Sequence, residues 1–311
     1  MILLAGIPSE PPLAMLKARL DEMGAPVVVF NQRDVAEARL CWSTVGGRLE
    51  GQLWLGGAVH ALGEFTAIYA RLMDDRLLPE LEAEPPDSPA RRHSRRLHEL
   101  LVQWIDVAPG RVVNRFRLMG SNGSKPYQAQ LIGRAGLRVP ETLVTNDPER
   151  LAAFRRRHDR IVFKSISGIR SIVTELEAGD ELDEGRVEAL RACPVQFQAY
   201  VPGFDVRAHV IGDEVIATRV DSAGTDYRYA ARDGLETALQ PWQLDPRLTA
   251  ACVALSSALG LAFTGIDLRI TPDGEVCCFE VNPSPAYSYY EANAGQPISL
   301  TLARYLVAAG R

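Results

Sequence analysis

The stretch FTGIDLRITPDGEVCCFEVNPSP, residues 263–285, decides the fold of this chain. It reads as two apolar strands joined by a tight turn at residues 272–274. Asp267 and Glu280 interrupt the strands where a core would require Val or Leu, and Asn282 follows two positions after Glu280. A buried carboxylate is costly unless a positive group holds it. The hairpin therefore predicts a bound cation.

These three side chains predict an oxygen-rich metal site. Side chains alternate along a strand, so Glu280 and Asn282 share a face, and Asp267 comes roughly opposite Glu280 across the turn. Two carboxylates and an amide oxygen are ligands that Mg²⁺ prefers, as one or two ions, with Mn²⁺ as a substitute. A solvated strand face is the alternative that these residues alone leave open.

Two lysines favour the metal site because they predict a phosphate partner. Lys125 opens a predicted helix over residues 124–137, after the N-cap candidate Ser124. Lys164 ends the apolar strand IVF and precedes the small-residue loop SISGIRS, whose N–H groups and hydroxyls suit phosphate. The alternatives are a surface lysine at a helix start and a lysine that snorkels from a strand end.

The next polar positions lie on three predicted strands. The segment QFQAYV, residues 196–201, could pair with an adenine edge through its main chain, although a plain core strand is the better explanation when the segment is taken alone. Asp205 and Arg207 alternate on the following strand, as do Arg219 and Asp221 on the one after it. Cross-strand ion pairing is the alternative for these four residues.

Composition excludes several classes of protein. The 311 residues carry a formal net charge of -5, whereas a general nucleic-acid binder is normally basic. No apolar run approaches the ~18 residues of a membrane span. The five cysteines are odd in number and contain no C-x-x-C pair, so we expect neither a disulfide framework nor a zinc site, but a reducing cytoplasm.

The chain changes character near residue 115. Before it, the strand-like segments ILLAGI and PVVVF flank the helical pattern LAMLKARLDEMG. This strand-helix-strand order favours a parallel sheet. After residue 115, helices and antiparallel hairpins alternate, as in an α+β protein.

The order of these parts resembles the ATP-grasp ligases. The resemblance is strongest to the branch that holds ribosomal-protein glutamate ligases and graspetide (microviridin-type) peptide macrocyclases. It covers the chain from about residue 110 to the C-terminus, and residues 121–147 are similar to that branch's opening. It implies α/β and α+β architecture, with an N-terminal α/β domain (1–115), a central lid lobe (116–200) and a C-terminal metal-binding lobe (201–311), the two lobes clamping ATP.

The resemblance also assigns roles to residues. Lys125 and Lys164 would contact the ATP phosphates, and residues 165–171 would form the loop that covers them. Arg207 and Arg219, with Lys164, would face the phosphates or the acyl intermediate as catalytic residues. The remaining expected contacts are the phosphate loop residues Ser165, Ser167, Gly168 and Ser171, the adenine hinge residues Gln198, Tyr200 and Val201, the ribose-side or lid-side Asp205, and the Mg²⁺ ligands Asp267, Glu280 and Asn282.

The implied reaction is ligation through an acyl phosphate, with ADP and phosphate as products. No protein nucleophile is required, and an amine or a hydroxyl is the acceptor. A small-molecule kinase and a nucleotide-binding module without catalysis are the alternatives. Arg228, Ser284 and Tyr287 lie where relatives contact the second substrate, and loop packing is their alternative role. We expect a carboxylate substrate, a peptide acceptor in keeping with the resembled branch, no membrane partner, and a homodimer as one possible state.

Overall fold

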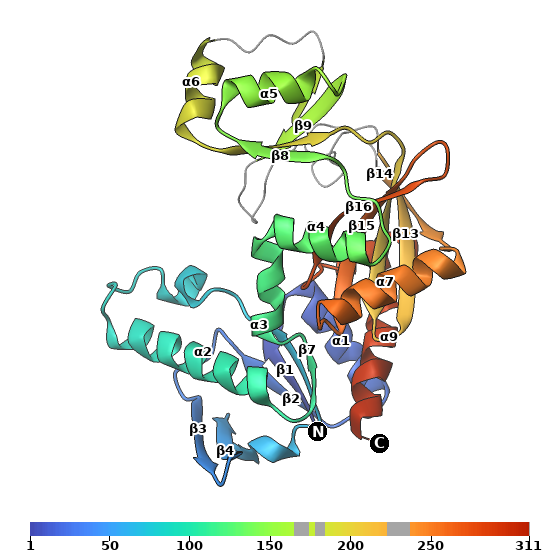
Figure 1. The fold of residues 1–311 in the computed structure, drawn as a ribbon. Coiled ribbons are helices and arrows are strands. Elements are labelled where there is room, and N and C mark those ends of the chain that lie inside the picture. The colour runs from blue at the N-terminus through green and yellow to red at the C-terminus, as the bar shows by residue number, and fades with distance from the viewer. Residues whose placement is uncertain (165–173, 178–183, 223–236, 311) are drawn as a thin grey trace.

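The computed structural model of the chain describes residues 1–164, 174–177, 184–222 and 237–310 (Figure 1). Its strands form four sheets: two in the N-terminal part, one in the middle and one near the C-terminus. In addition to the helices and strands given below, short 3₁₀ turns occur at Leu62–Glu64, Asp75–Leu77, Pro79–Leu81, Gly120–Gly123 and Ala308–Gly310.

The N-terminal sheet is parallel, as the sequence pattern predicts. Its strands β1 (Ile2–Gly6), β2 (Val27–Asn31), β6 (Ala67–Arg71) and β7 (Arg111–Val113) lie in the order β2-β1-β6-β7. Helix α1 (Pro11–Glu22) connects β1 to β2, and α2 (Pro89–Val107) precedes β7. Because strand side chains alternate, Leu3 and Leu4 of β1 enter different cores on the two faces of the sheet.

A small antiparallel sheet extends this part of the molecule. It consists of β3 (Arg39–Val45), β4 (Arg48–Leu55) and β5 (Ala58–Ala61), in that order. It packs through Leu40 and Leu53 against the same core as Leu97 and Trp104 of α2.

The middle sheet is antiparallel and carries two helices on one face. Its strands β8 (Thr142–Thr145), β9 (Arg160–Lys164), β10 (Thr174–Glu177) and β11 (Val195–Ala199) lie in the order β10-β9-β11-β8. Phe154 of α5 (Pro148–Arg155) and Leu190 of α6 (Glu184–Ala192) pack against Ile161 and Phe197 of the sheet. Figure 1 shows this lobe at the top, apart from the remainder of the chain.

The C-terminal sheet is also antiparallel. Its order is β14-β13-β12-β15-β16, with β12 (Phe204–Ile211), β13 (Glu214–Ser222), β14 (Thr237–Trp242), β15 (Phe263–Ile270) and β16 (Val276–Asn282). Two helices, α4 (Lys125–Arg134) and α7 (Pro246–Ala258), share a core with one face of this sheet. The short helix α3 (Phe116–Met119) precedes α4.

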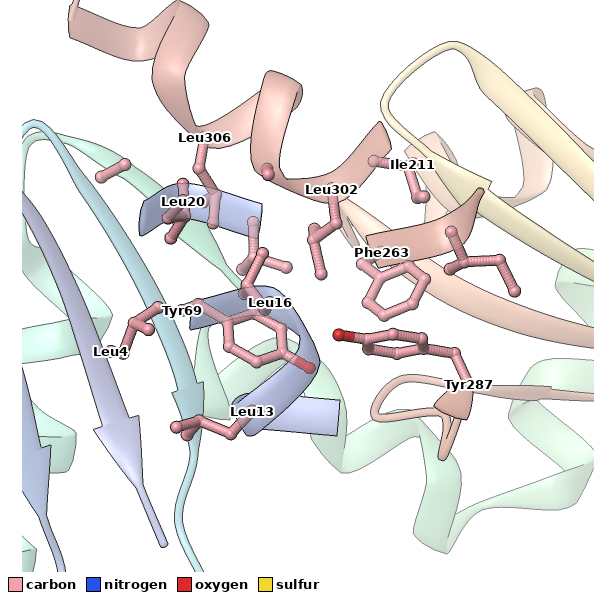
Figure 2. Packing of buried hydrophobic residues seen from close by; sticks show 14 of the residues in the cluster. Leu4, Leu13, Leu16, Leu20, Tyr69, Ile211, Phe263, Tyr287, Leu302 and Leu306 are labelled. Carbon is pink, nitrogen blue, oxygen red and sulfur yellow. The ribbon is translucent and has the colours of Figure 1, made fainter. Parts of the chain in front are cut away.

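The last two helices return to the N-terminal part. Residues of α8 (Ser288–Ala294) and α9 (Ile298–Val307) join one buried cluster with α1 and β1. Figure 2 shows Leu16 and Leu20 of α1 in this cluster together with Leu302 and Leu306 of α9. This shared core shows that the N-terminal and C-terminal parts of the chain pack together. The domain boundaries at 115/116 and 200/201 stay predictions. Within the described ranges, no helix combines the length and apolarity needed to cross a membrane.

Candidate active site

The hairpin β15-β16 brings the three predicted metal ligands to one face. Asp267 pairs directly with Glu280, and Gly265 pairs with Asn282. The register shifts immediately after Asp267, because Leu268 pairs with Cys278. Phe279 is therefore an extra residue in β16, and this bulge lets Glu280 share the face of Asp267.

The donor set fits a hard divalent cation. The side chains of Asp267 and Glu280 are each 20% exposed, so both carboxylates remain reachable from solvent. Two carboxylates and the amide oxygen of Asn282 suit Mg²⁺, which prefers oxygen ligands. In the part of the chain that the structure describes, no group of three or more His, Cys, Asp or Glu residues could hold a metal ion.

Two cations already contact these carboxylates. Arg207 of β12 lies opposite Asp267, and its Nη1 is 2.5 Å from Oδ1 of that residue. Lys125, the first residue of α4, places Nζ 2.8 Å from Oε2 of Glu280 and donates to Asn122 Oδ1 at 3.1 Å. Ser124 occupies the N-cap position but makes no side-chain capping bond. The face therefore combines acceptors for a metal with donors for phosphate.

The Arg207 guanidinium occupies space that is free because residue 265 is glycine. A Cβ at Gly265 would come 2.4 Å from Nη2 of Arg207. The Arg207 guanidinium is also 5.7 Å from the ring of Tyr290, which stacks edge-on with the fully buried His209. Burial, with the nearby charge of Arg207, holds the pKa of His209 well below its ordinary value.

Two buried amides, not identified from the sequence, hold the hairpin in place. Gln128 of α4 exchanges hydrogen bonds with the main chain of Val281, which lies between Glu280 and Asn282. Asn114 donates to the carbonyls of Phe263 and Pro283, at the two ends of the hairpin. In the sequence Gln128 is a polar residue between Tyr127 and Ala129, whereas Asn114 stands between Val113 and Arg115, and neither pattern reveals the partners of these amides.

The structure corrects the prediction that Arg219 faces the reaction. Arg219 pairs with Val206, whereas Arg207 pairs with Thr218, so the two arginines lie on opposite faces of the sheet. Arg219 stacks 4.0 Å from the Phe204 ring and forms an ion pair with Asp221 at 2.7 Å. The alternative from the sequence was cross-strand ion pairing, whereas the ion pair found here joins Arg219 to Asp221 of the same strand.

The segment predicted to bind adenine runs from β11 toward β12. Gln198 is buried and donates to Thr142 Oγ1 at 3.1 Å. The N–H of Tyr200 bonds to the Arg160 carbonyl, and the Val201 carbonyl accepts from Arg269. The segment is thus fixed to both neighbouring sheets at the position where one continues into the other.

A cavity of about 550 Å³ adjoins this segment. Asp205, the predicted ribose-side residue, lines it and pairs with Arg269 at 2.8 Å. Burial alone would lower the pKa of Arg269, but its hydrogen bonds to Asp205 raise that pKa above the ordinary arginine value. Arg160 lies 3.7 Å over the Tyr200 ring. The full lining comprises Arg160, Glu175, Tyr200, Gly203, Phe204, Asp205, Val220, Asp221, Ser222 and Arg269.

Several predicted contacts fall outside the described residues. These are the phosphate loop residues Ser165, Ser167, Gly168 and Ser171, and the candidate substrate residue Arg228. For Lys164 the structure gives the main chain, which ends β9 and pairs with Gln196.

The two remaining candidate substrate residues lie at the junction with the N-terminal part. Ser284 accepts a hydrogen bond from Arg71 at 3.0 Å. Tyr287 is fully buried in the shared core, and its hydroxyl donates to the Pro12 carbonyl (Figure 2). Burial excludes a substrate contact for Tyr287 in this structure, which corrects the prediction in favour of loop packing.

Comparison with known sequences agrees with the geometry. The sequence profile of the RimK-like ATP-grasp domain matches residues 123–306, which is more than half of the chain. A probable alpha-L-glutamate ligase 2 of Shewanella amazonensis is 26% identical over 213 residues, or 63% of this chain and 70% of that protein. A probable alpha-L-glutamate ligase of Photobacterium profundum is 28% identical over 202 residues, or 62% and 66%.

Solved structures align over almost the whole chain. The ATP-grasp ligase PsnB, in complex with a phosphomimetic variant of its minimal precursor, Mg and ADP, has a TM-score of 0.77 and 27% identity, covering 100% of this chain and 98% of PsnB. A RiPP-associated ATP-grasp ligase of Chryseobacterium gregarium, with ADP and a leader and core peptide, has a TM-score of 0.83, 19% identity and coverages of 99% and 96%.

The macrocyclase MdnC of Microcystis aeruginosa, bound with its precursor peptide MdnA, has a TM-score of 0.78, 21% identity and coverages of 99% and 99%. The ATP-grasp fold predicted from the motifs is confirmed by these alignments. The predicted cofactors, ATP and Mg²⁺, agree with the ADP and Mg found with PsnB. The chain belongs to the RimK-like ATP-grasp domain family and is an ATP-dependent ligase.

Proposed function

We propose that this ligase activates a carboxylate of a peptide or amino-acid substrate and joins it to an amine or a hydroxyl. A carboxylate oxygen attacks the γ-phosphorus of ATP, and the bond to the β-phosphate oxygen breaks to release ADP. The acceptor nitrogen or oxygen then attacks the acyl carbon and loses its proton, and phosphate leaves. Phosphoryl transfer of this kind depends on positioning and charge neutralisation more than on a protein nucleophile.

The observation that carries this proposal is the shared face of Asp267, Glu280 and Asn282, with two cations in contact. These three residues would hold Mg²⁺, which when bound supplies positive charge to the phosphate oxygens. Lys125, which contacts Glu280 at 2.8 Å, would donate to the same phosphate oxygens. Arg207, 94% buried beside Asp267, is suited to hold negative charge that develops at the acyl carbon.

The nucleotide would lie between the middle and C-terminal sheets. Residues 198–201 would contact the adenine through their main chain, and Asp205 would face the ribose from the cavity wall. Lys164 and the loop 165–171 are proposed to cover the phosphates. Arg219 is omitted from this set, because its side chain lies on the far face of the sheet.

A peptide is the substrate class that we favour. PsnB, which is 27–28% identical to this chain, was solved with its minimal precursor and with its precursor peptide PsnA2. Arg228 remains the proposed partner of a substrate carboxylate. The cytoplasmic location and the homodimeric state stay predictions from the sequence.

Calorimetry with ADP and Mg²⁺ tests the nucleotide site directly. The purified chain should take up ADP in a Mg²⁺-dependent manner, and Glu280→Gln should lose that dependence while its thermal unfolding stays close to wild type. Glu275→Gln, on the same hairpin but exposed and paired with Arg138, is the matched control. Mg²⁺-independent binding that is unchanged in Glu280→Gln would contradict the metal site.

Product analysis tests the reaction. With ATP and a peptide encoded beside the gene, the ligase should release ADP and phosphate and remove water from the peptide mass. Formation of AMP and pyrophosphate would exclude an acyl phosphate route. A phosphorylated product without free phosphate would indicate the kinase that the sequence left as an alternative.

A further inference from the structure

The segment at the end of the β15-β16 hairpin has few backbone N–H groups that could donate hydrogen bonds. It reads Asn282-Pro283-Ser284-Pro285, and the two prolines have no N–H group. The one N–H among the last three residues, that of Ser284, donates to Oδ1 of Asn282 at 2.9 Å. The carbonyls of this segment therefore depend on donors from elsewhere in the chain.

Arg71 supplies most of these donors. It is the last residue of β6, at the carboxyl edge of the N-terminal sheet. Its Nη1 donates to the Ser284 carbonyl at 3.3 Å, to the Ser284 hydroxyl at 3.0 Å and to the Pro285 carbonyl at 3.1 Å. The Pro283 carbonyl accepts from Asn114. The N-terminal part thus fixes the segment at three consecutive residues.

Glu10 orients Arg71. It precedes α1 and accepts from Nε of Arg71 at 3.1 Å and from Nη2 at 2.5 Å. The Arg71 side chain is 11% exposed, so the pair is largely removed from water. Burial alone would lower the pKa of Arg71, but its hydrogen bond to Glu10 raises that pKa above the ordinary arginine value. Arg71 is therefore a fixed cation with all three nitrogens engaged.

We propose that Arg71 is a positioning residue for the metal site. It holds Ser284, the N–H of Ser284 holds the side-chain oxygen of Asn282, and Asn282 is the third proposed metal ligand. Glu10, at the end of this chain of contacts, keeps the guanidinium in the orientation that reaches Ser284. The N-terminal part thereby contributes to Mg²⁺ binding without touching the metal. This inference rests on the proposed function of Asn282.

Arg71→Met removes the donors and keeps an unbranched, apolar stem in place of the arginine side chain. We expect ADP affinity in the presence of Mg²⁺ to fall about tenfold, as for the loss of one charge-assisted hydrogen bond. ADP affinity without Mg²⁺ should stay unchanged, because Arg71 lines no part of the nucleotide cavity. Arg33→Met, which breaks an exposed pair with Glu80 in the same part of the chain, should change neither value.

Hydrogen exchange gives a readout that is independent of the nucleotide. Pro283 and Pro285 have no N–H, so Ser284 carries the single amide hydrogen of residues 283–285. The exchange of this amide is followed in proteolytic peptides that cover the segment. Its exchange should become about tenfold faster in Arg71→Met, because the carbonyl and hydroxyl of the same residue lose their donor. Arg71→Lys, which keeps the charge next to Glu10, should restore part of the protection and provides the test if Arg71→Met does not fold.

The outcomes separate the two proposals. If the wild-type chain shows no Mg²⁺-dependent uptake of ADP, the proposed function fails. If the wild type shows it and Arg71→Met retains it in full, the positioning role is wrong. Equal weakening with and without Mg²⁺ would also overturn the role, because it would indicate a general structural effect.

Discussion

Gln128 and Val281 are joined by two hydrogen bonds: Nε2 of Gln128 donates to the Val281 carbonyl at 2.7 Å, and the Val281 N–H donates to Oε1 of Gln128 at 3.1 Å. Val281 belongs to β16, the edge strand of the C-terminal sheet. The side chain of Gln128 thus takes the place of a further strand at the one residue between Glu280 and Asn282. Lys125, one turn earlier on α4, contacts Glu280 from the same helix.

Gln128→Leu should destabilise the fold and the site together. The change leaves a buried N–H and a buried carbonyl without their partner, at a cost of about 3 kcal/mol in the free energy of unfolding. Urea unfolding measures this loss. Gln130→Leu is the control, because Gln130 is exposed on the same helix and should shift the free energy by less than about 0.5 kcal/mol. Equal effects of the two variants would contradict the role of Gln128.

Gly265→Ala should displace Arg207 from Asp267. The new Cβ would lie 2.4–2.5 Å from three atoms of the Arg207 guanidinium, which is closer than any stable contact. We expect a loss of about 1–3 kcal/mol in stability and at least a tenfold loss of turnover. Gly133→Ala is the control, since a Cβ there meets nothing within 4 Å and alanine favours the helix. Full activity of Gly265→Ala would show that Arg207 can act from another position.

The sequence predicts the parts of this site that depend on local pattern. Alternation along a strand places Glu280 and Asn282 on one face, and the strand-helix-strand order near the N-terminus predicts the parallel sheet. The position of Asp267 opposite Glu280 does not follow from alternation alone. A regular continuation of the pairing between Leu268 and Cys278 would place Phe279 opposite Asp267, and only the bulge brings Glu280 there.

The register of the β12-β13 hairpin already contradicts the prediction that Arg219 shares the face of Arg207. The Gly212-Asp213 pair is typical of a hairpin turn, and such a turn pairs Ile211 with Glu214 and, in the same register, Arg207 with Thr218. Arg219 must then lie on the other face. In contrast, Asn114, Gln128 and Arg71 act on residues more than 100 positions away, and no periodicity in the sequence encodes those partners.

Substitution of the two arginines by lysine should therefore give unequal results. Arg207→Lys replaces a buried planar fork beside Asp267, and we expect turnover to fall about 100-fold. Arg219→Lys weakens stacking on Phe204 and Trp242, so we expect a loss of about 1 kcal/mol in stability with turnover within about threefold of wild type. Steady-state kinetics and thermal unfolding measure the two effects. A comparable loss of turnover in both variants would show that Arg219 reaches the substrate despite its face.

His209 should make the stability of the chain sensitive to acid. It is fully buried, and neither ring nitrogen has a hydrogen-bond partner among the described residues. The groups that face it are the Arg207 cation and the rings of Tyr290 and Phe263. Burial, followed by the Arg207 charge, lowers the pKa of His209 in the folded chain, whereas the unfolded chain titrates near ~6.5.

Between those two pKa values the unfolded state binds the extra proton. The contribution of neutral His209 to stability is therefore complete above pH ~6.5 and decreases as the pH falls, by up to ~1.4 kcal/mol per pH unit, until the folded pKa is reached. His209→Met removes this titration and should flatten the pH dependence of the unfolding free energy below pH ~6.5. Urea unfolding of both proteins across that range measures the difference in slope. Burial also lowers the pKa of His98, but His98 is present in both proteins, so its contribution cancels in the difference. Parallel profiles would mean that His209 takes up its proton without loss of stability, and the buried pair with Arg207 would then have to rearrange in acid.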